Sequence, residues 1–275
     1  MEQPECPRWC TTRVTFVGNA STIRAVVASA GLAAAMACGG SRNTPAGPSS
    51  APPPPFAAES ANFRCYYSSG DSVQVERQEA CHAWAVVRLG VVVPRKIEYR
   101  KYTSGEDMGA RTGKSNTHAY AEPEEFTIHT LWSWGNHETV HIYTALIGRP
   151  SDFFNEGIAV AFQTDPLSGD FEPRFNGEQV HDAARRYRQL GQLVLPLSSI
   201  VSATGFRGIT DSTLSYRESG SFVAFLITRF GIDRELQFFR TGTKDDALET
   251  IRGRFEQAFG STLEKAEADW LAFAG

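Results

Sequence analysis

The 275-residue chain lacks several features that mark common functional classes. It has no long basic run and its formal net charge is −4, so nucleic-acid binding has no electrostatic support. The apolar run at residues 25–37 is shorter than the ~20 residues of a membrane-spanning helix. No internal repeat is visible. The length allows one large domain or two modest ones with a well-buried core.

The N-terminal segment resembles an export signal. Residues 25–37 (AVVASAGLAAAMA) carry no charge and follow Arg13 and Arg24, as in the apolar core of a signal peptide. Cys38 follows in AMACGGS, which resembles a bacterial lipoprotein lipobox, although Ala35 stands where leucine is usual. The resemblance implies a lipidated Cys38 and export to the cell envelope. A plain secretory signal and a buried helix are the alternatives.

Composition divides the chain into three regions. Residues 1–38 form the signal and lipobox region. Residues 39–61 are rich in Pro, Ser and Ala, with PPPP at 52–55, and are expected to form an extended tether. Residues 62–275 are expected to fold into the globular domain.

Cysteine is scarce, with five in the chain. Cys6 and Cys10 precede the apolar run and would be removed with the signal, and Cys38 is the lipidation candidate. Cys65 and Cys81 remain, and an even pair in an exported domain predicts a disulfide. Two free buried thiols are the alternative.

Apolar periodicity indicates a mixed part at 62–132 and a helical part at 133–275, hence an α+β fold. The mixed part is expected to hold a helix at 76–89, loops and short strands at 104–124, and strands at 63–67, 96–102 and 125–131. A capping box at Ser261 and Glu264 predicts a last helix that runs through Trp270. The other helices are expected at 133–147, 152–163, 178–190, 216–230, 232–240 and 246–259.

The stretch NHETVHIYT, residues 136–144, contains the most informative spacing. His137 and His141 lie four apart on a predicted helix, so both imidazoles can reach one metal ion. Glu138 lies about 100° around the helix and can reach a water held by that metal. Two neutral histidines suit Zn²⁺, which lowers the pKa of its water toward ~7 while a carboxylate takes the proton. The alternative is an ordinary helix with two histidines on one face.

The next predicted helix offers a third ligand. It contains FFNEGIAVAF, residues 153–162, with Glu156 near its start. The loop at 148–151 is short, so this helix must fold back against the first and can direct Glu156 at the metal. A hydrolytic zinc site needs three protein ligands and an open position for water. The alternative is a solvated glutamate that the helix dipole favours.

These segments together resemble a known family. HETVH, FFNEGIA and the later YRESGSFVAFLITRFG (216–231) are similar to the gluzincin zinc metallopeptidases, in particular the bacterial peptidase-MA-like domains. The resemblance spans roughly residues 63–275. It implies a zincin fold of the thermolysin-like, gluzincin type, with catalytic base Glu138 and one Zn²⁺ per chain on His137, His141 and Glu156. The gap before Glu156 is shorter than in thermolysin-like and aminopeptidase-type members.

A zinc hydrolase also needs a group that stabilises the oxyanion, typically Tyr, His or Arg. Tyr216, at the start of the predicted helix at 216–230, is the first candidate. The alternative is that this tyrosine only anchors the start of the helix. His181 is the second candidate, in a charged helix where an exposed histidine is common. No chemistry is assigned to the three remaining histidines, His82, His118 and His129.

The partners of the metal ligands are left open by the sequence. Thermolysin-type enzymes place an acid four residues after the glutamate ligand, where this chain has Val160. Asn155, Asp152 or a backbone carbonyl are the substitutes that a metal-bound histidine can use.

The predicted strand EFTIHTL, residues 125–131, precedes the histidine helix. By the family resemblance, a strand edge beside the cleft binds an extended peptide, which makes a polypeptide the expected partner. The aminopeptidase motif that captures a free N-terminus is absent, which favours an endopeptidase or a peptidase of unassigned type. We therefore expect a lipid-anchored zinc metallopeptidase of the cell envelope. The alternatives are a tethered binding protein on a degenerate peptidase fold and a zinc hydrolase of non-peptide bonds.

Overall fold

The computed structural model describes residues 51–274, which belong to one compact unit. The predicted signal and lipobox region, Cys38 and the first part of the tether lie outside the described residues. Within residues 51–274, no helix combines the length and the apolar character that a membrane crossing requires.

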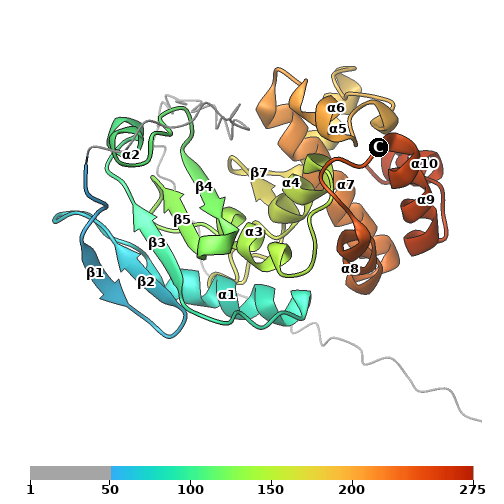
Figure 1. Cartoon of the computed structure of the whole chain (residues 1–275). Coiled ribbons are helices and arrows are strands. Elements are labelled where there is room, and N and C mark those ends of the chain that lie inside the picture. The colour runs from blue at the N-terminus through green and yellow to red at the C-terminus, as the bar shows by residue number, and fades with distance from the viewer. Residues whose placement is uncertain (1–50, 275) are drawn as a thin grey trace, which may run out of the picture. The chain divides into compact units, whose positions relative to one another are not determined.

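One five-stranded sheet forms the N-terminal part, in the order β1-β2-β3-β5-β4 (Figure 1). β2, β3 and β5 are parallel, and β1 and β4 pair antiparallel at the two edges. The strands are β1 Phe56–Glu59, β2 Phe63–Tyr66, β3 Ile97–Lys101, β4 Ala119–Glu122 and β5 Thr127–Thr130. The three predicted strands are thus confirmed as β2, β3 and β5, each somewhat shorter than its pattern.

The alternation in β3 shows why these residues form a strand with two different faces. Ile97, Tyr99 and Lys101 are buried, while Glu98 and Arg100 between them are half-buried. Helix α1, Val75–Leu89, adds Ala85 and Leu89 to the hydrophobic cluster that also contains Ile97. Since Tyr99 lies opposite Ile128 of β5, the buried row continues across the sheet.

Two expectations for this part are corrected. The strand at 125–131 was expected to offer an edge to a peptide, but β5 lies between β3 and β4, so its backbone groups are already paired. The edge on that side of the sheet is β4. In addition, β1 lies inside the predicted tether and pairs with β2, and Pro54 before it is buried. The folded domain therefore begins before residue 62.

The segment at 104–124 also contains more structure than expected, because helix α2, Gly105–Thr112, precedes β4. Met108 is the one buried residue of α2, so this helix has no apolar periodicity. The sequence feature that marks this helix is its N-cap, Ser104, whose side chain accepts a hydrogen bond from the Asp107 backbone N–H. A 3₁₀ turn, η1 Pro123–Glu125, then joins β4 to β5.

Helices dominate the chain after the sheet. They are α3 His137–Ala145, α4 Asp152–Ala161, α5 Val180–Gln189, α6 Ala203–Arg207, α7 Ser212–Phe230, α8 Ile232–Thr241, α9 Leu248–Phe259 and α10 Leu263–Phe273. A short hairpin (β6 Arg174–Phe175 and β7 Glu178–Gln179) and a 3₁₀ turn (η2 Leu197–Ser199) lie between α4 and α6. The expected division into a sheet followed by a helical part is confirmed.

Several helix boundaries differ from the predictions, and α6 joins α2 as a helix that was not foreseen. Helix α3 begins at His137 rather than at residue 133. Helix α7 begins at Ser212, where the Asp211 side chain caps it by accepting from the Leu214 N–H. Helix α10 is capped by Thr262 rather than by Ser261. The five-residue helix α6 was not predicted, because it is too short to show a period.

Helices α4 and α7 lie side by side and pack closely (Figure 1). Each presents a glycine to the other. A Cβ on Gly157 of α4 would lie 2.6 Å from Val223 Cγ2 and 2.9 Å from the Ser219 carbonyl oxygen. A Cβ on Gly220 of α7 would lie 2.2 Å from Val160 Cγ1. Glycine at both positions is therefore what permits this close approach.

The predicted disulfide is wrong. Cys65 in β2 and Cys81 in α1 are both free thiols and both buried. Burial raises the pKa of Cys65 to about 11 and that of Cys81 to about 12. Both thiols are therefore neutral and unreactive at neutral pH, which is the behaviour of small core residues.

Helix α8 contains a buried acid without a partner. Glu235 is fully buried, and neither carboxyl oxygen has a hydrogen-bond partner within the described part of the chain. Burial raises the pKa of Glu235 to about 8, so the carboxyl stays protonated at neutral pH.

This shift makes stability depend on pH. In the unfolded chain the carboxyl titrates near ~4.3, so the folded state should lose stability as the pH rises from there to about 8. We expect Glu235→Gln to match the wild type in free energy of unfolding at pH 4.5 and to exceed it at pH 8, in urea titrations. The control is Glu256→Gln, which changes an exposed glutamate of α9. An equal difference at both pH values would contradict the neutral carboxyl.

Candidate metal centre

The turn between α3 and α4 brings the two predicted metal-binding helices together. It passes so close to α8 that a Cβ on Gly148 would lie 2.3 Å from the Phe239 carbonyl oxygen. Pro150 is buried, and α4 begins two residues later and runs back against α3. The short loop at 148–151 therefore folds α4 back against α3, as the sequence predicted.

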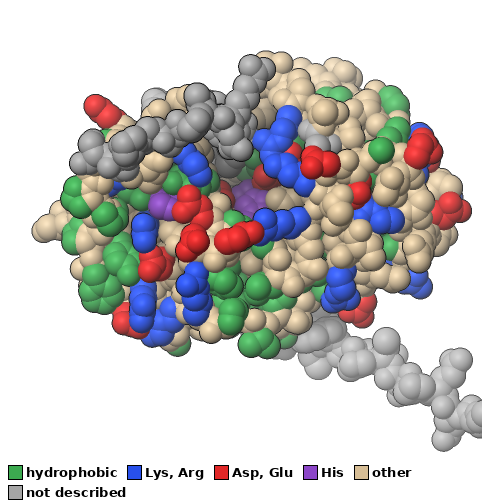
Figure 2. All heavy atoms as spheres, in the orientation of Figure 1, with side chains coloured by type: hydrophobic (Ala, Val, Ile, Leu, Met, Phe, Trp, Pro, Cys, Tyr) green, Lys and Arg blue, Asp and Glu red, His purple; other side chains and the backbone are tan. Residues whose placement is uncertain are grey.

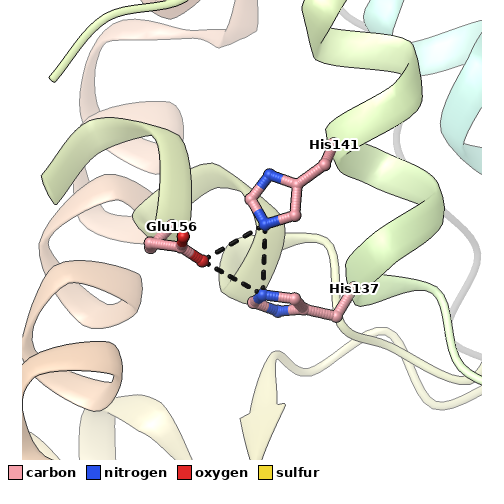
Figure 3. Close-up of side chains that lie close together, drawn as sticks. All are labelled: His137, His141 and Glu156. Atoms are coloured by element: carbon pink, nitrogen blue, oxygen red, sulfur yellow. Dashed lines mark hydrogen bonds and ion pairs between the residues drawn. The ribbon is translucent and has the colours of Figure 1, made fainter. Parts of the chain in front are cut away.

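The side chains of His137, His141 and Glu156 converge on one point (Figure 3). His137 Nε2 and His141 Nε2 each lie 3.2 Å from Glu156 Oε2, and they lie 3.3 Å from each other. The side chains of His137 and His141 are 11% exposed and that of Glu156 is 17% exposed. Figure 2 shows histidine side chains in a hollow with charged side chains of both signs around it.

This triangle has the dimensions of a metal site. If the three donor atoms occupy three corners of a regular tetrahedron, its centre lies about 0.61 of an edge length from each of them. Edges of 3.2–3.3 Å therefore place a central ion about 2.0 Å from all three donor atoms, the usual distance for zinc bound to nitrogen or oxygen. A zinc ion held by these three donors would take a water or a substrate as its fourth ligand.

The electrostatics of the triangle also fit a cation. Burial raises the pKa of Glu156, but the two histidines outweigh burial and hold this pKa far below its ordinary value. Burial lowers the pKa of His141, but Glu156 outweighs burial and raises it to about 9. Positive charge is therefore favoured between these groups, as a proton or as a metal ion. A metal binds the deprotonated histidines and must displace that proton.

Asn155 supplies the partner of one histidine that the sequence left open. Its amide nitrogen Nδ2 lies 3.3 Å from His141 Nδ1, and the amide oxygen takes that place when the amide group is turned by 180°. When His141 uses Nε2 for a metal, Nδ1 carries the proton and donates it, so the amide oxygen of Asn155 must face the ring. His137 Nδ1 is buried and has no hydrogen-bond partner within residues 51–274.

Glu138 lies beside the three donors and is 8% exposed. Burial raises the pKa of Glu138, the two histidines lower it, and Glu156 raises it again. The Ala121 backbone N–H of the edge strand β4 also lowers this pKa, which places the edge strand against the carboxylate. A carboxylate with opposing influences of this kind suits proton transfer at neutral pH.

Tyr216 is brought next to the histidines but does not anchor a helix start, because α7 begins four residues earlier. Its ring lies 5.8 Å from that of His137 and stacks on Phe175 of the β6–β7 hairpin at 5.1 Å. Arg217 holds this hairpin, since its Nε and Nη2 donate to the Phe175 carbonyl oxygen and its Nη1 lies 2.7 Å from Glu178. The hairpin therefore fixes the position of the Tyr216 ring.

Sequence reasoning missed Arg207, the last residue of α6. Arg207 forms an ion pair with Asp152, the first residue of α4 and one turn before Glu156. The Asp152 carboxylate raises the pKa of Arg207 most, and Glu156 and Tyr216 raise it further, so the guanidinium lies within electrostatic reach of the donors. Asp152 is thus not the partner of a histidine.

The remaining histidines lie in other contacts. His181, the second oxyanion candidate, places Nδ1 2.9 Å from Ser221 Oγ and packs its ring on Phe273, which makes it part of the packing of α5 on α7 and α10. His82 contacts Tyr143, His118 packs near Trp132, and His129 contacts Tyr102 and Glu122.

No protein-family model matches this chain, and no characterised protein matches it in sequence. The function is therefore inferred from the geometry of the centre and of the fold around it.

The glycine beside Glu156 gives a direct test of this geometry. We expect Gly157→Ala to lower the free energy of unfolding by about 1–3 kcal/mol, because the new Cβ overpacks against α7. It should also weaken divalent-metal binding, since Glu156 moves with α4. The measurements are urea denaturation and calorimetric zinc titration.

The matched control is Gly253→Ala in α9, where a Cβ meets nothing within 4 Å. This variant should gain up to about 1 kcal/mol from helix propensity and bind metal as the wild type does. Equal effects of the two substitutions would show that α4 and α7 do not require the close approach.

Proposed function

We propose that the protein is a zinc-dependent metallopeptidase that hydrolyses peptide bonds. The observation that carries the proposal is the triangle of His137, His141 and Glu156, with Glu138 beside it. A set of two imidazoles and one carboxylate is typical of catalytic zinc sites. One Zn²⁺ per chain follows from one such cluster within residues 51–274.

The fold around the triangle supports a zincin architecture of the gluzincin type. An antiparallel edge strand, β4, packs against the helix that carries both histidines. The third donor comes from the next helix, in the second, helical part of the domain. This arrangement resembles that of peptidase-MA-like domains, as the HETVH and FFNEGIA motifs imply.

Each group has a defined task in the proposed reaction. Bound zinc would acidify a water and polarise the scissile carbonyl. Glu138 would accept a proton from the attacking water and pass it to the leaving amine. The Tyr216 hydroxyl donates to the oxygen on which negative charge develops. Backbone groups on the outer edge of β4 hold an extended polypeptide beside Glu138.

We further propose that the chain is exported and lipid-anchored at Cys38, which rests on the lipobox-like AMACGGS segment. In that arrangement the peptidase domain faces the cell envelope, and the anchor is its contact with the membrane.

A second function, binding of a polypeptide without cleavage, is favoured by two observations. His137 Nδ1 is buried without a described partner, and Val160 replaces the acid that thermolysin-type enzymes place after the glutamate ligand. A degenerate peptidase fold that binds zinc and a polypeptide without cleaving it is consistent with this incomplete support.

Metal content and turnover separate the two functions. The purified protein should hold about one zinc per chain by elemental analysis, and Glu138→Gln should hold the same amount. Glu138→Gln should lose peptide-library cleavage by on the order of 10²–10⁴-fold, because the base is gone. Turnover that survives this substitution would overturn the mechanism, and zinc without cleavage in the wild type would favour the binding protein.

The Tyr216 hydroxyl can be removed without the ring. We expect Tyr216→Phe to keep zinc content and KM, and to lower kcat on the order of 10²-fold, because the hydroxyl acts in the transition state. Phe175→Leu is the companion variant, since it removes the ring that stacks on Tyr216 and should lower kcat less. An unchanged kcat in Tyr216→Phe would exclude it as the oxyanion donor.

A further inference from the structure

Arg207 is a cation beside the metal centre that the proposed reaction does not use. It closes α6, and α6 packs on α4, the helix of Glu156. The preceding residue, Phe206, lies 5.8 Å from the ring of Tyr216, which lies 5.8 Å from the ring of His137. Arg207 is thus fixed on the side of the centre where Tyr216 lies.

The two side chains of the ion pair between Arg207 and Asp152 differ in their exposure to solvent. The Asp152 side chain is 8% exposed, whereas the Arg207 side chain is 39% exposed. In a pair with a structural role both side chains are largely buried, as in the ion pair of Arg254 and Asp246, which are 13% and 11% exposed. Asp152 binds Arg207 through Nε, so the buried acid holds the guanidinium by one nitrogen while the arginine side chain stays partly exposed.

We propose that Arg207 binds a carboxylate of the substrate next to the scissile bond, and thereby selects peptides that carry a carboxylate on the Tyr216 side of the metal. The inference rests on the proposed peptidase function and names its substrate class. A guanidinium offers two parallel N–H donors that match the two oxygens of a planar carboxylate. The carboxylate is either the C-terminus of the peptide or the side chain of Asp or Glu.

The charges at the centre agree with this role. Zinc with Glu138 and Glu156 sums to zero, and so does Arg207 with Asp152. A substrate carboxylate therefore meets no net repulsion and gains an oriented donor pair in a half-buried place.

Binding of paired inhibitors tests the inference without turnover. The probes are peptide hydroxamates of one sequence, in which the hydroxamate chelates zinc and the far end is a free carboxylate or a carboxamide. A third probe has an amidated end and an Asp side chain. Dissociation constants are measured by calorimetry on zinc-loaded Glu138→Gln protein, which cannot turn over.

We expect one of the carboxylate probes to bind at least about tenfold more tightly than the carboxamide, as a charge-assisted bidentate contact implies. Adding Arg207→Gln should reduce this ratio to about one. Arg207→Lys, which keeps the charge but loses the fork, should give an intermediate ratio and covers the case in which the Gln variant does not fold. Arg252→Gln, which changes an arginine of α9 away from the centre, should leave the ratio unchanged.

The outcomes are distinguishable. Equal binding of all three probes by a zinc-loaded parent would overturn the carboxylate inference and leave the peptidase proposal standing. An Arg207 variant that weakens all probes equally would assign the residue to the chelated carbonyl region instead, which also overturns it. A parent that holds no zinc would refute the peptidase proposal, and this inference with it. The two carboxylate probes show whether a C-terminus or an acidic side chain is bound.

Discussion

The candidate centre depends on the close crossing of α4 and α7. Gly157 faces α7 while its neighbour Glu156 faces the histidines of α3, because adjacent helical residues point about 100° apart. The separation of α4 and α7 therefore determines how closely the Glu156 carboxylate approaches the two histidines. Edges of 3.2–3.3 Å fit an ion with bonds of about 2.0 Å, and a displacement of about 1 Å would spoil that fit. A packing contact thus sets the spacing of the three candidate donor atoms.

Charge balance is the second constraint on this region. Glu138 and Glu156 are nearly buried together with two histidines, and two buried carboxylates at one place require positive charge. A dication at the triangle satisfies both acids at once. Arg207 could have balanced Glu156 directly, but Asp152 engages it one helical turn away. The separation keeps the donor atoms of Glu156 directed at the histidines and leaves the arginine for another anion.

The sequence predicted those parts of the fold that repeat a simple pattern. The alternation in β3, the HExxH spacing and the glycine after α7 reflect local geometry, and each was found where expected. The helix α2 was missed because its one buried residue, Met108, leaves no period, although the Ser104 cap was readable. The disulfide was wrong because cysteine parity says nothing about the direction of the two side chains. Arg207 and Asp152 lie 55 residues apart in the chain, and nothing local to either predicts their pairing.

The edge strand links the two parts of the domain in a way that no motif encodes. The family resemblance implied that the strand before the histidine helix, residues 125–131, binds the peptide. The sheet order places β4 outside it, and the Ala121 N–H of β4 faces Glu138. The N-terminal sheet thus supplies an unpaired edge beside the base, and the helical part supplies Glu156, Tyr216 and Arg207. The proposed hydrolysis would use the β4 edge, Glu138, Glu156 and Tyr216, while Arg207 would select the substrate, so the proposed function belongs to the junction of the two parts and to neither part alone.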